Sequence, residues 1–359
     1  MYIPAAAARS GGLEPGRLIR SDATSSQNLD TATSKDTPAV SIVIVSWNAT
    51  KYLQECLTSL FDARHASTLE VIVVDNASSD DSSAMVQRLF PEAILIQNTD
   101  NLGFARANNI GIRRARGRHI ALVNSDVHVL PDCIEKLVQY LDANPNVSMV
   151  GPRILGRDGK LQTSHRGFPR LWNMFCRALA LDSLLPNVPL FGGYLFKYSE
   201  PVTPTPVEII SGCFVLVSRE ALEEVGLLDE LFFIYGEDMD WCKRFWRAGR
   251  PVVFVPAAES IHYGGGSSSN APLRFFVEKQ KADLQYWRKH HSRISVAVYL
   301  VLSVLHHAIR LIGHGMASIA GAKNSGSHLH RAKCSSVCLK WIVANIGAAR
   351  DVANAQSGH

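Results

Sequence analysis

The sequence predicts an α/β fold in which helices flank a mostly parallel central sheet. From Val40 onward, short apolar runs of strand length alternate with segments that have the apolar spacing of helices. Apolar runs of this kind are expected of parallel strands that are buried on both faces. Polar residues follow each of the first four runs, at the position where ligands bind on such sheets. We therefore expect one domain at residues 39–270, between an N-terminal tail and a C-terminal extension.

The first half of this domain, residues 39–152, contains repeated strand–helix units, which join parallel strands by right-handed crossovers. Ser79 or Asp80 is placed to cap the second helix, and Pro131 suits the first position of the fourth helix. The expected strands are 40–45, 70–74, 93–97, 119–123 and 148–151, and the expected helices are 51–61, 81–90, 103–115 and 131–142.

The second half begins after an insertion at residues 153–206, which is rich in Pro and Gly and is expected to be irregular. The regular pattern then returns over residues 207–270. The sequence predicts a strand at 207–218, a helix at 219–225, a helix at 236–249 and a strand at 251–255.

The N-terminal residues 1–38 are rich in Ala, Ser, Thr and Gly and have no periodic apolar pattern, so they are expected to be a disordered tail. No apolar segment follows a basic start, so no secretory signal is expected. The 7 cysteines are dispersed without paired spacing, which favours reduced thiols in a cytosolic compartment.

The C-terminal extension, residues 271–359, is basic. Residues 271–350 contain 12 Lys or Arg and 2 Asp or Glu, which gives them a net charge of +10. The whole chain has a net charge of +5, so the remaining residues are net negative. This polarity indicates an anionic partner. Residues 294–312 are strongly apolar but include His306, His307 and Arg310. A helix lying in the membrane interface and a buried terminal helix both fit this pattern, and a helix crossing the membrane fits less well.

Three carboxylates, Glu237, Asp238 and Asp240, begin the helix predicted at 236–249. Acidic residues stabilise the first turn of a helix through its dipole, so a purely structural role is one interpretation. The aromatic and apolar run at 232–235 comes just before them and favours a pocket wall. A carboxylate held against such a wall can have a raised pKa and act as a general base.

The residues after the first four strands form a second group of candidates. Such residues are often only turns and caps, but four successive polar ends favour one polar ligand across the sheet edge. No Gly-rich phosphate motif follows the first strand, so a phosphate ligand needs another counter-charge, such as a divalent metal. Asp126 offers an oxygen ligand for Mg²⁺ or Mn²⁺, while His262 is either a second ligand or a hydrogen-bonded structural residue.

The segments of the chain that contain these candidate residues resemble those of family 2 inverting glycosyltransferases, which have the GT-A fold. The donor half of that family is similar to VSWNATKYLQECLTSL, VIVVDNASSD, NLGFARANNIGI and ALVNSDV, and the acceptor half to SGCFVLVSREALEEVGLLDELFFIYGEDMDWCKRFWRAG and PAAESIHYGGGSSS. The resemblance covers residues 40–269 and is greatest to bacterial rhamnosyltransferase-type enzymes that build cell-surface polysaccharide.

The resemblance implies a role for each candidate residue. Asp238 in the GED motif is the expected base, with Glu237 and Asp240 secondary. Asp126 is the last carboxylate of a DxD metal motif whose first position holds Asn124 here, and His262 completes the site for Mg²⁺ or Mn²⁺. The residues expected to bind the nucleotide sugar are Ser46, Asn48, Asp75, Asn101, Phe104, Asn108 and Asn124.

The expected function is transfer of a sugar, most plausibly rhamnose-like, from a nucleotide diphosphate sugar to a saccharide or lipid-linked saccharide acceptor. The alternatives are a metal-dependent sugar nucleotidyltransferase and a non-catalytic protein that binds a sugar, a nucleotide or nucleic acid. Basic charge beside an apolar helix favours an anionic membrane surface over nucleic acid as a partner. The expected location is cytoplasmic and peripheral, at the inner face of the membrane. The donor sugar, the base, the acceptor and the oligomeric state stay open.

Overall fold

The structure is a computed structural model of the 359-residue chain. It describes residues 37–62, 68–185, 188–192, 201–264, 272–321 and 325–345. The expected N-terminal tail therefore lies outside the described residues, except for Thr37 and Pro38, and so does most of the glycine-rich segment after His262.

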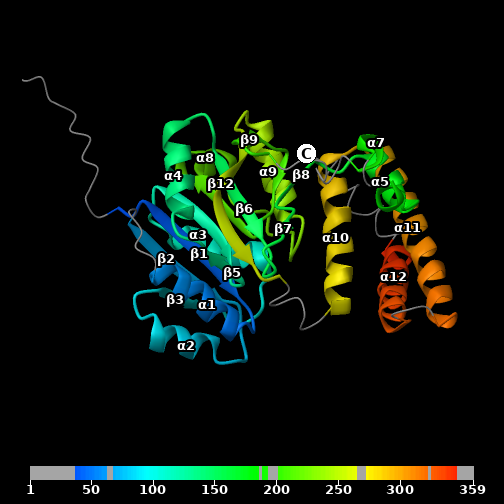
Figure 1. The fold of residues 1–359 in the computed structure, drawn as a ribbon, viewed down its shortest axis with the longest axis horizontal. Coiled ribbons are helices and arrows are strands. Elements are labelled where there is room, and N and C mark those ends of the chain that lie inside the picture. Colours follow the sequence, from blue (N-terminus) through cyan, green and yellow to red (C-terminus); the bar gives the residue numbers. More distant parts are fainter. Residues whose placement is uncertain are drawn as a thin grey trace, which may run out of the picture. The chain divides into compact units, whose positions relative to one another are not determined.

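A mixed sheet in the order β3-β2-β1-β4-β11-β6-β12-β5 forms the centre of the domain, as Figure 1 shows. The pairs β3–β2, β2–β1, β1–β4 and β6–β12 are parallel, whereas β11 and β5 run antiparallel to their neighbours. The strands of this sheet are β1 (Val40–Ser46), β2 (Leu69–Asp75), β3 (Ile94–Gln97), β4 (His119–Asn124), β5 (Val127–Val129), β6 (Met149–Leu155), β7 (Leu161–Gln162), β9 (Thr205–Pro206), β11 (Phe214–Ser218) and β12 (Val252–His262).

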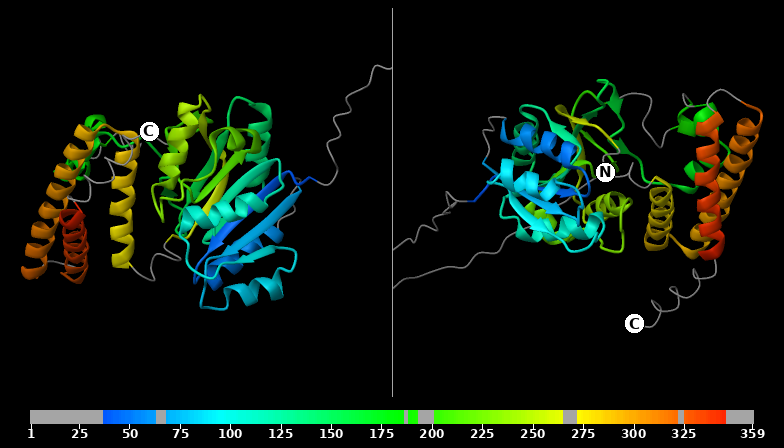
Figure 2. Two further views of the ribbon diagram at one scale, coloured as in Figure 1. Left: turned by 180° about the vertical axis from the view of Figure 1, so that it is seen from behind. Right: turned by 90° about the horizontal axis from the view of Figure 1, so that it is seen from below.

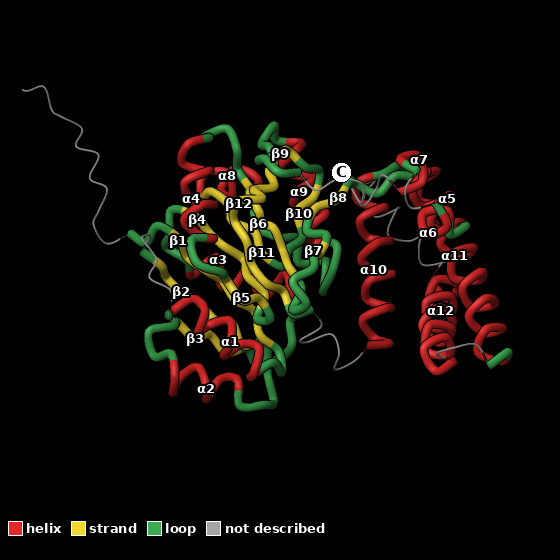
Figure 3. Tube along the Cα trace, viewed as in Figure 1, coloured by secondary structure: helices red, strands yellow, loops and turns green. Residues whose placement is uncertain are grey.

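Helices cover both faces of the sheet, because alternate strand residues point to opposite sides. On β1, Val43 belongs to one buried cluster, and Ile42 and Ile44 belong to the other. The first cluster includes residues of α3 (Phe104–Arg114), α8 (Arg219–Val225) and α9 (Glu237–Arg247), and the second includes residues of α1 (Thr50–Phe61), α2 (Ser82–Leu89) and α4 (Cys133–Ala143). Figure 3 shows the resulting helix–sheet–helix layers. The expected α/β class with a mostly parallel core is confirmed.

A helical extension follows the domain and packs onto it. It consists of α10 (Pro272–His290), α11 (Arg293–Ile319) and α12 (Ser325–Asn345). Figure 2 shows α11 beside α12 and α5 (Leu171–Ala178), and both contacts are extensive. Side chains of α10 enter the first buried cluster, among them Leu284 and Trp287. The first helix of the extension, α10, therefore packs into the hydrophobic core of the domain.

The insertion at 153–206 is more regular than expected. It has many Pro and Gly residues, yet it contains β7, α5, α6 (Leu181–Leu184), α7 (Pro189–Gly192) and β8 (His165–Arg166), which pairs with β10 (Ile209–Ile210). The prediction of an irregular segment is therefore wrong for these elements. Strand β8 depends on a partner that is distant in the sequence, so no local pattern reveals it. Strand β7 instead pairs with the nearby end of β6.

Several element boundaries also differ from the prediction, and β6, for example, extends to Leu155 rather than ending at 151. The strand expected at 207–218 is interrupted between β10 and β11, where Gly212 borders a cavity. Strand β12 extends to His262 rather than ending at 255, because a register shift after Val255 lets it continue past Pro256. The helix expected from Pro131 begins at Cys133, because Asp132 adopts a left-handed conformation with φ of 60°.

Candidate active site

Two adjoining cavities lie at the carboxyl ends of the parallel strands. The sheet-edge cavity, of about 280 Å³, is bordered by Trp47, Asn76, Asn101, Ser125, Asp126 and Phe275 among others. The lateral cavity, of about 650 Å³, extends from Asp238 and Arg166 to the helical extension. Both cavities are lined by Phe104, Asn124, Ile234, Tyr235 and His262. Two ligands bound in these cavities would therefore meet at these shared residues.

Three buried oxygens at this edge have no hydrogen-bond partner among the described residues: Ser46 Oγ, Asp75 Oδ1 and Asn124 Oδ1. They come from the ends of β1, β2 and β4, which are neighbours in the sheet. A buried polar atom without a partner costs free energy, and most such atoms in proteins are satisfied. Their grouping at one edge indicates a polar ligand, as expected from the sequence.

Asn76 holds the loop that borders the sheet-edge cavity. Its amide nitrogen donates to Asn101 Oδ1 at 2.9 Å, and its Oδ1 accepts from the Leu102 backbone N–H at 3.0 Å. The loop ends at Gly103, whose φ of 84° and close approach to the Phe233 carbonyl exclude a side chain there. Asn101 thus borders the cavity while also bracing the loop.

Two of the candidate ligand-binding residues, Asn48 and Asn108, form hydrogen bonds within the protein and do not line a cavity. Asn48 adopts a left-handed conformation, and its Oδ1 accepts from the Ser79 backbone N–H at 2.7 Å. Asn108 is buried in α3, and its amide nitrogen donates to the Phe104 carbonyl at 2.9 Å. Neither side chain lines the two cavities. Ser46 and Asp75 do not line them either. Binding of the nucleotide sugar by these four residues therefore stays a prediction.

Asp126 and His262 are brought together by the antiparallel pairing of β5 with β12. His262 Nε2 lies 3.3 Å from Asp126 Oδ1, and His262 Nδ1 lies 3.0 Å from Gln162 Oε1. A hydrogen bond from Nδ1 to Gln162 leaves Nε2 as the free acceptor, which is the arrangement that metal-binding histidines use. Adjacent ligands of an octahedral Mg²⁺ or Mn²⁺ lie about 3.0 Å apart, so this pair fits one metal ion. Among the described residues, no third His, Cys, Asp or Glu joins them.

Asp238 faces the lateral cavity from the first turn of α9. Its Oδ2 lies 3.0 Å from Arg166 Nη2, and its Oδ1 accepts from the Met239 backbone N–H at 2.8 Å. The Asp238 side chain is 13% exposed, which is enough for contact with a ligand in the cavity. A carboxylate has about four lone-pair sites, so these contacts leave acceptor capacity for a ligand hydroxyl.

Glu237 is buried beside Asp238 and also lines the lateral cavity. Burial, followed by the negative charge of Asp238, raises the pKa of Glu237 to about 8. Its Oε2 has no hydrogen-bond partner among the residues that the structure describes. Glu237 is therefore mostly protonated at neutral pH.

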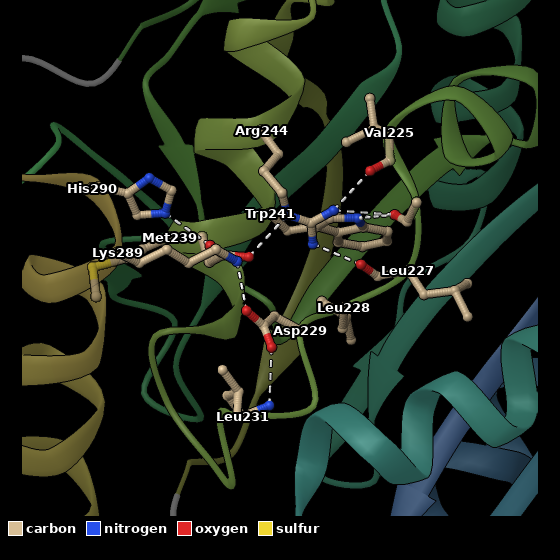
Figure 4. A network of polar contacts seen from close by, with 12 residues as sticks. Val225, Leu227, Leu228, Asp229, Leu231, Met239, Trp241, Arg244, Lys289 and His290 are labelled. Carbon is tan, nitrogen blue, oxygen red and sulfur yellow. Dashed lines mark hydrogen bonds and ion pairs between the residues drawn. The ribbon is translucent and has the colours of Figure 1, made fainter. Parts of the chain in front are cut away.

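Asp240 is buried and lines neither cavity. It belongs to a polar network whose members Arg244, Lys289 and His290 are labelled in Figure 4. Its carboxylate accepts from Arg244 Nε at 2.9 Å, Lys289 Nζ at 2.7 Å and His290 Nε2 at 2.8 Å. Burial alone would raise the pKa of Asp240, but these hydrogen bonds and positive charges outweigh it and lower the pKa to about 2. Asp240 therefore ties α9 to α10 rather than orienting Asp238.

Arg166 and Gln162 were not among the residues predicted from the sequence. Each contacts a predicted site residue that is distant in the chain, and each lies in a two-residue strand. Neither belongs to a motif with a recognisable spacing. The long-range pairing of β8 with β10 places Arg166 at the site. The short hairpin of β7 with β6 positions Gln162, whose partner His262 comes from the distant strand β12.

A polar ligand site at the strand ends, a candidate metal pair and an adjacent carboxylate are the features of a nucleotide-sugar-dependent glycosyltransferase with the GT-A fold. The model of glycosyl transferase family 2 matches residues 41–226. The chain belongs to this family, which confirms the family and the fold expected from the sequence.

Relatives with known names support this assignment. The chain is 28% identical to an N-acetylglucosaminyl-diphospho-decaprenol L-rhamnosyltransferase of Mycobacterium tuberculosis, over 71% of this chain and 86% of the relative. It is 27% identical to a dTDP-rhamnosyl transferase of Shigella flexneri, over 75% of this chain and 87% of the relative. A mannosyltransferase from Pyrobaculum calidifontis, solved with GDP-Man and Mn²⁺, has a similar fold, with a TM-score of 0.52, 16% identity and coverage of 87% of each chain.

Proposed function

We propose that this protein transfers a deoxyhexose, rhamnose or a close relative, from a nucleotide diphosphate sugar to a lipid-linked saccharide during cell-surface polysaccharide synthesis. The observation that carries the proposal is the pair of adjoining cavities, one at the strand ends and one beside Asp238. The names of the two rhamnosyltransferase relatives supply the sugar and the acceptor class.

The nucleotide sugar occupies the sheet-edge cavity in this proposal. Ser46 and Asp75 do not line this cavity, but each has a buried oxygen without a partner among the described residues at the end of β1 or β2, and we assign these oxygens to the nucleoside. Phe104 and Asn124 line both cavities and are assigned to the diphosphate and the sugar. The loop that Asn76 and Asn101 brace then covers the ribose. The sugar lies at the junction with the lateral cavity, which receives the acceptor.

Asp238 is the general base of the proposed reaction. It takes the proton of the acceptor hydroxyl as that oxygen attacks the anomeric carbon from the face opposite the leaving diphosphate, so the configuration is inverted. No covalent sugar–enzyme intermediate is needed, and one carboxylate suffices. Arg166 holds the Asp238 carboxylate in place at 3.0 Å. Glu237, protonated at neutral pH, avoids a second negative charge beside the base.

Asp126 and His262 are assigned as the ligands of a divalent metal, Mg²⁺ or Mn²⁺. Their spacing fits neighbouring positions of one octahedral ion, and Gln162 orients His262. Such an ion supplies neutralisation of the negative charge that grows on the leaving diphosphate. Because only two protein ligands are present among the described residues, the diphosphate oxygens and water would complete the coordination.

The proposed reaction is tested by incubating the protein with lipid-linked N-acetylglucosamine and a panel of dTDP-rhamnose, UDP-galactose and UDP-N-acetylglucosamine. We expect release of a nucleoside diphosphate and a product of inverted anomeric configuration with dTDP-rhamnose. Exhaustive chelation should abolish transfer, and Mn²⁺ or Mg²⁺ should restore it in the wild type but much less in His262→Ala. Pyrophosphate release would instead indicate a nucleotidyltransferase, and full activity after chelation would exclude the metal site.

An exposed apolar face on α11 supports association with a membrane surface. This helix is long and apolar enough to cross a membrane by length and composition, yet only 11% of its apolar window is buried. Its exposed residues recur every three or four positions, which places them on one face of the helix: Ile294, Val298, Val301, Leu305, Ile309, Ile312, Met316 and Ile319. The basic extension around this face suits an anionic membrane, with the domain on the cytoplasmic side. A helix buried in the core, the other interpretation of this segment, does not fit this exposure.

Replacing Val301 by Asp is expected to lower binding to anionic phospholipid vesicles by about tenfold, because a charge replaces a side chain that enters the acyl boundary. Cosedimentation with vesicles measures this binding. Val202→Asp is the matched control, since Val202 is 84% exposed but lies in the catalytic domain. Equal vesicle binding by Val301→Asp and by Val202→Asp would contradict the membrane-facing role of α11.

A further inference from the structure

The far side of the lateral cavity is formed by the helical extension together with α5 and α6, and it carries three basic and two acidic side chains. Arg177 of α5, Lys279 of α10 and Arg310 of α11 line it together with Asp182 and Asp283. Arg310 is the only Lys, Arg, Asp or Glu between Ile294 and Ile319 of α11. A charge within so apolar a helix is costly and commonly marks a binding site.

Some basic side chains of this cavity form ion pairs with acidic side chains, and others do not. Arg166 is paired with Asp238 at 3.0 Å, and Lys279 Nζ lies 3.7 Å from Asp283 Oδ1. Arg177 and Arg310 form no ion pair within the part of the chain that the structure describes, and Asp182 is the remaining acid on the cavity wall. These two arginines are called the arginine pair below.

Arg310 has hydrogen-bonding capacity that the protein does not use. Its Nη1 is buried and has no hydrogen-bond partner among the described residues. Arg177 and Asp182 both lie close enough for their charges to act on Arg310, and the repulsion by Arg177 is the larger of the two effects. Two neighbouring guanidinium groups repel each other unless an anion lies between them, and planar guanidinium groups match phosphate oxygens in geometry. The arrangement therefore favours a ligand with more than one negative charge.

The surroundings of the arginine pair suit an anion that has an apolar tail. Arg310 lies on the helix that carries the exposed apolar face, and α11 packs on α5, which carries Arg177. Helices α5 and α6 expose further large apolar side chains, namely Trp172, Phe175 and Leu184. At its other end the same cavity reaches Asp238, the proposed base. A ligand held by the arginine pair can therefore present one end to Asp238 and the other to lipid.

We propose that Arg177 and Arg310 bind the diphosphate of a polyprenyl-diphosphate-linked saccharide, so that the saccharide extends along the lateral cavity toward Asp238. This inference rests on the proposed function and adds the site that recognises the acceptor. Nucleotide phosphates are bound in the sheet-edge cavity, so the protein has two separate phosphate sites. The arginine pair recognises the linker of the acceptor rather than its sugar.

The test uses two acceptor analogues without any nucleotide sugar. Both carry N-acetylglucosamine and a short isoprenyl tail, joined in one by a diphosphate and in the other by a neutral ether. Equilibrium binding to the full chain in a neutral detergent is measured for each analogue. The wild type is expected to prefer the diphosphate analogue by about tenfold or more, as charge-assisted hydrogen bonds allow.

Arg310→Gln and Arg177→Gln are each expected to remove most of this preference and to leave binding of the ether analogue unchanged. Lys333→Gln removes the same charge from the exposed surface of α12 and should keep the preference. Arg310→Lys retains the charge without the planar fork and should keep part of it. Thermal unfolding of each variant establishes that it is folded. An undiminished preference in both glutamine variants would overturn the inference.

Competition identifies the source of the phosphate groups. Inorganic diphosphate and vesicles of anionic phospholipid are each added to the bound diphosphate analogue at equal concentrations of phosphate. Weak displacement by both is expected, because the saccharide and the tail also contribute to binding. Displacement as strong as by the unlabelled analogue would assign the arginine pair to a free anion or a membrane phospholipid instead. Failure of the proposed function can be distinguished from failure of this inference. If the proposed function is wrong, the wild type would release no nucleoside diphosphate from the nucleotide sugar.

Discussion

Sugar transfer by an Asp238→Asn variant is expected to fall by about 10²- to 10⁴-fold, the usual cost of removing a general base. An amide cannot take the proton of the acceptor hydroxyl, while its size preserves the shape of the lateral cavity. Asp238 does not line the sheet-edge cavity, so binding of the nucleotide sugar should stay within a few-fold of the wild type. Initial rates with a saturating donor and titration of the donor measure the two effects.

Glu237→Gln is the matched control for this substitution, because it changes a neighbouring carboxyl on the same turn of α9. The raised pKa of Glu237 means that the wild-type group is already mostly neutral at pH 7. Gln imitates that neutral state, so we expect the loss in Glu237→Gln to be at least about tenfold smaller than in Asp238→Asn. Near-normal turnover by Asp238→Asn would contradict its role as base, and a larger loss in Glu237→Gln would transfer that role to Glu237.

The largest effect on stability is expected from Asp240→Asn, which should lower the free energy of unfolding by about 3 kcal/mol. The Asp240 side chain is fully buried and accepts from Arg244, Lys289 and His290. Neutralising it leaves their charges facing one another. We place the cost at the low end of the range for broken buried pairs, because the side chain of Lys289 is 35% exposed. Denaturant titration at pH 7 measures the change.

The pH dependence gives this prediction a second test. The pKa of Asp240 is lowered to about 2 in the folded protein, below its value of about 4 in an unfolded chain. The stability that ionised Asp240 contributes is therefore present above about pH 4 and is lost as the pH falls toward 2. The difference between the wild type and Asp240→Asn should shrink over this interval.

The control for Asp240→Asn is Asp158→Asn, since Asp158 forms a solvent-exposed pair with Lys160, which should contribute little to stability. If Asp240→Asn costs no more than Asp158→Asn, the buried network does not stabilise the junction between α9 and α10. A difference between wild type and Asp240→Asn that stays constant from pH 7 to pH 3 would contradict the assignment of the low pKa.

The strands that the sequence predicts well are those with uninterrupted apolar runs. Strands β1, β2 and β4 are buried at nearly every position, so the local pattern is enough to find them. Strand β12 is different, because Pro256 and Glu259 interrupt its pattern and its continuation depends on pairing with β5 and β6. The short strand β8 likewise depends on its pairing with the distant strand β10.

In the candidate site, too, the residues that depend on distant partners could not be predicted from the sequence. Motifs and strand ends indicate Asp126, His262 and Asp238, because their residue types and positions carry the signal. The side chains that hold them, Gln162 and Arg166, come from 100 and 72 residues away in the sequence. The role of Asp240 could not be predicted for the same reason, since its partner His290 lies 50 residues further along. Long-range partners need the folded topology.

The junction between α9 and α10 has a consequence for which sugars the enzyme can extend. Asp240 contacts α10 and lies only two residues after Asp238, so the proposed base is held close to the helical extension. When α11 rests on a bilayer, Asp238 stands at a set height above the lipid plane. A hydroxyl close to its lipid anchor and one several sugars away cannot both reach that height. The extension would then act as a molecular ruler that selects acceptors by length.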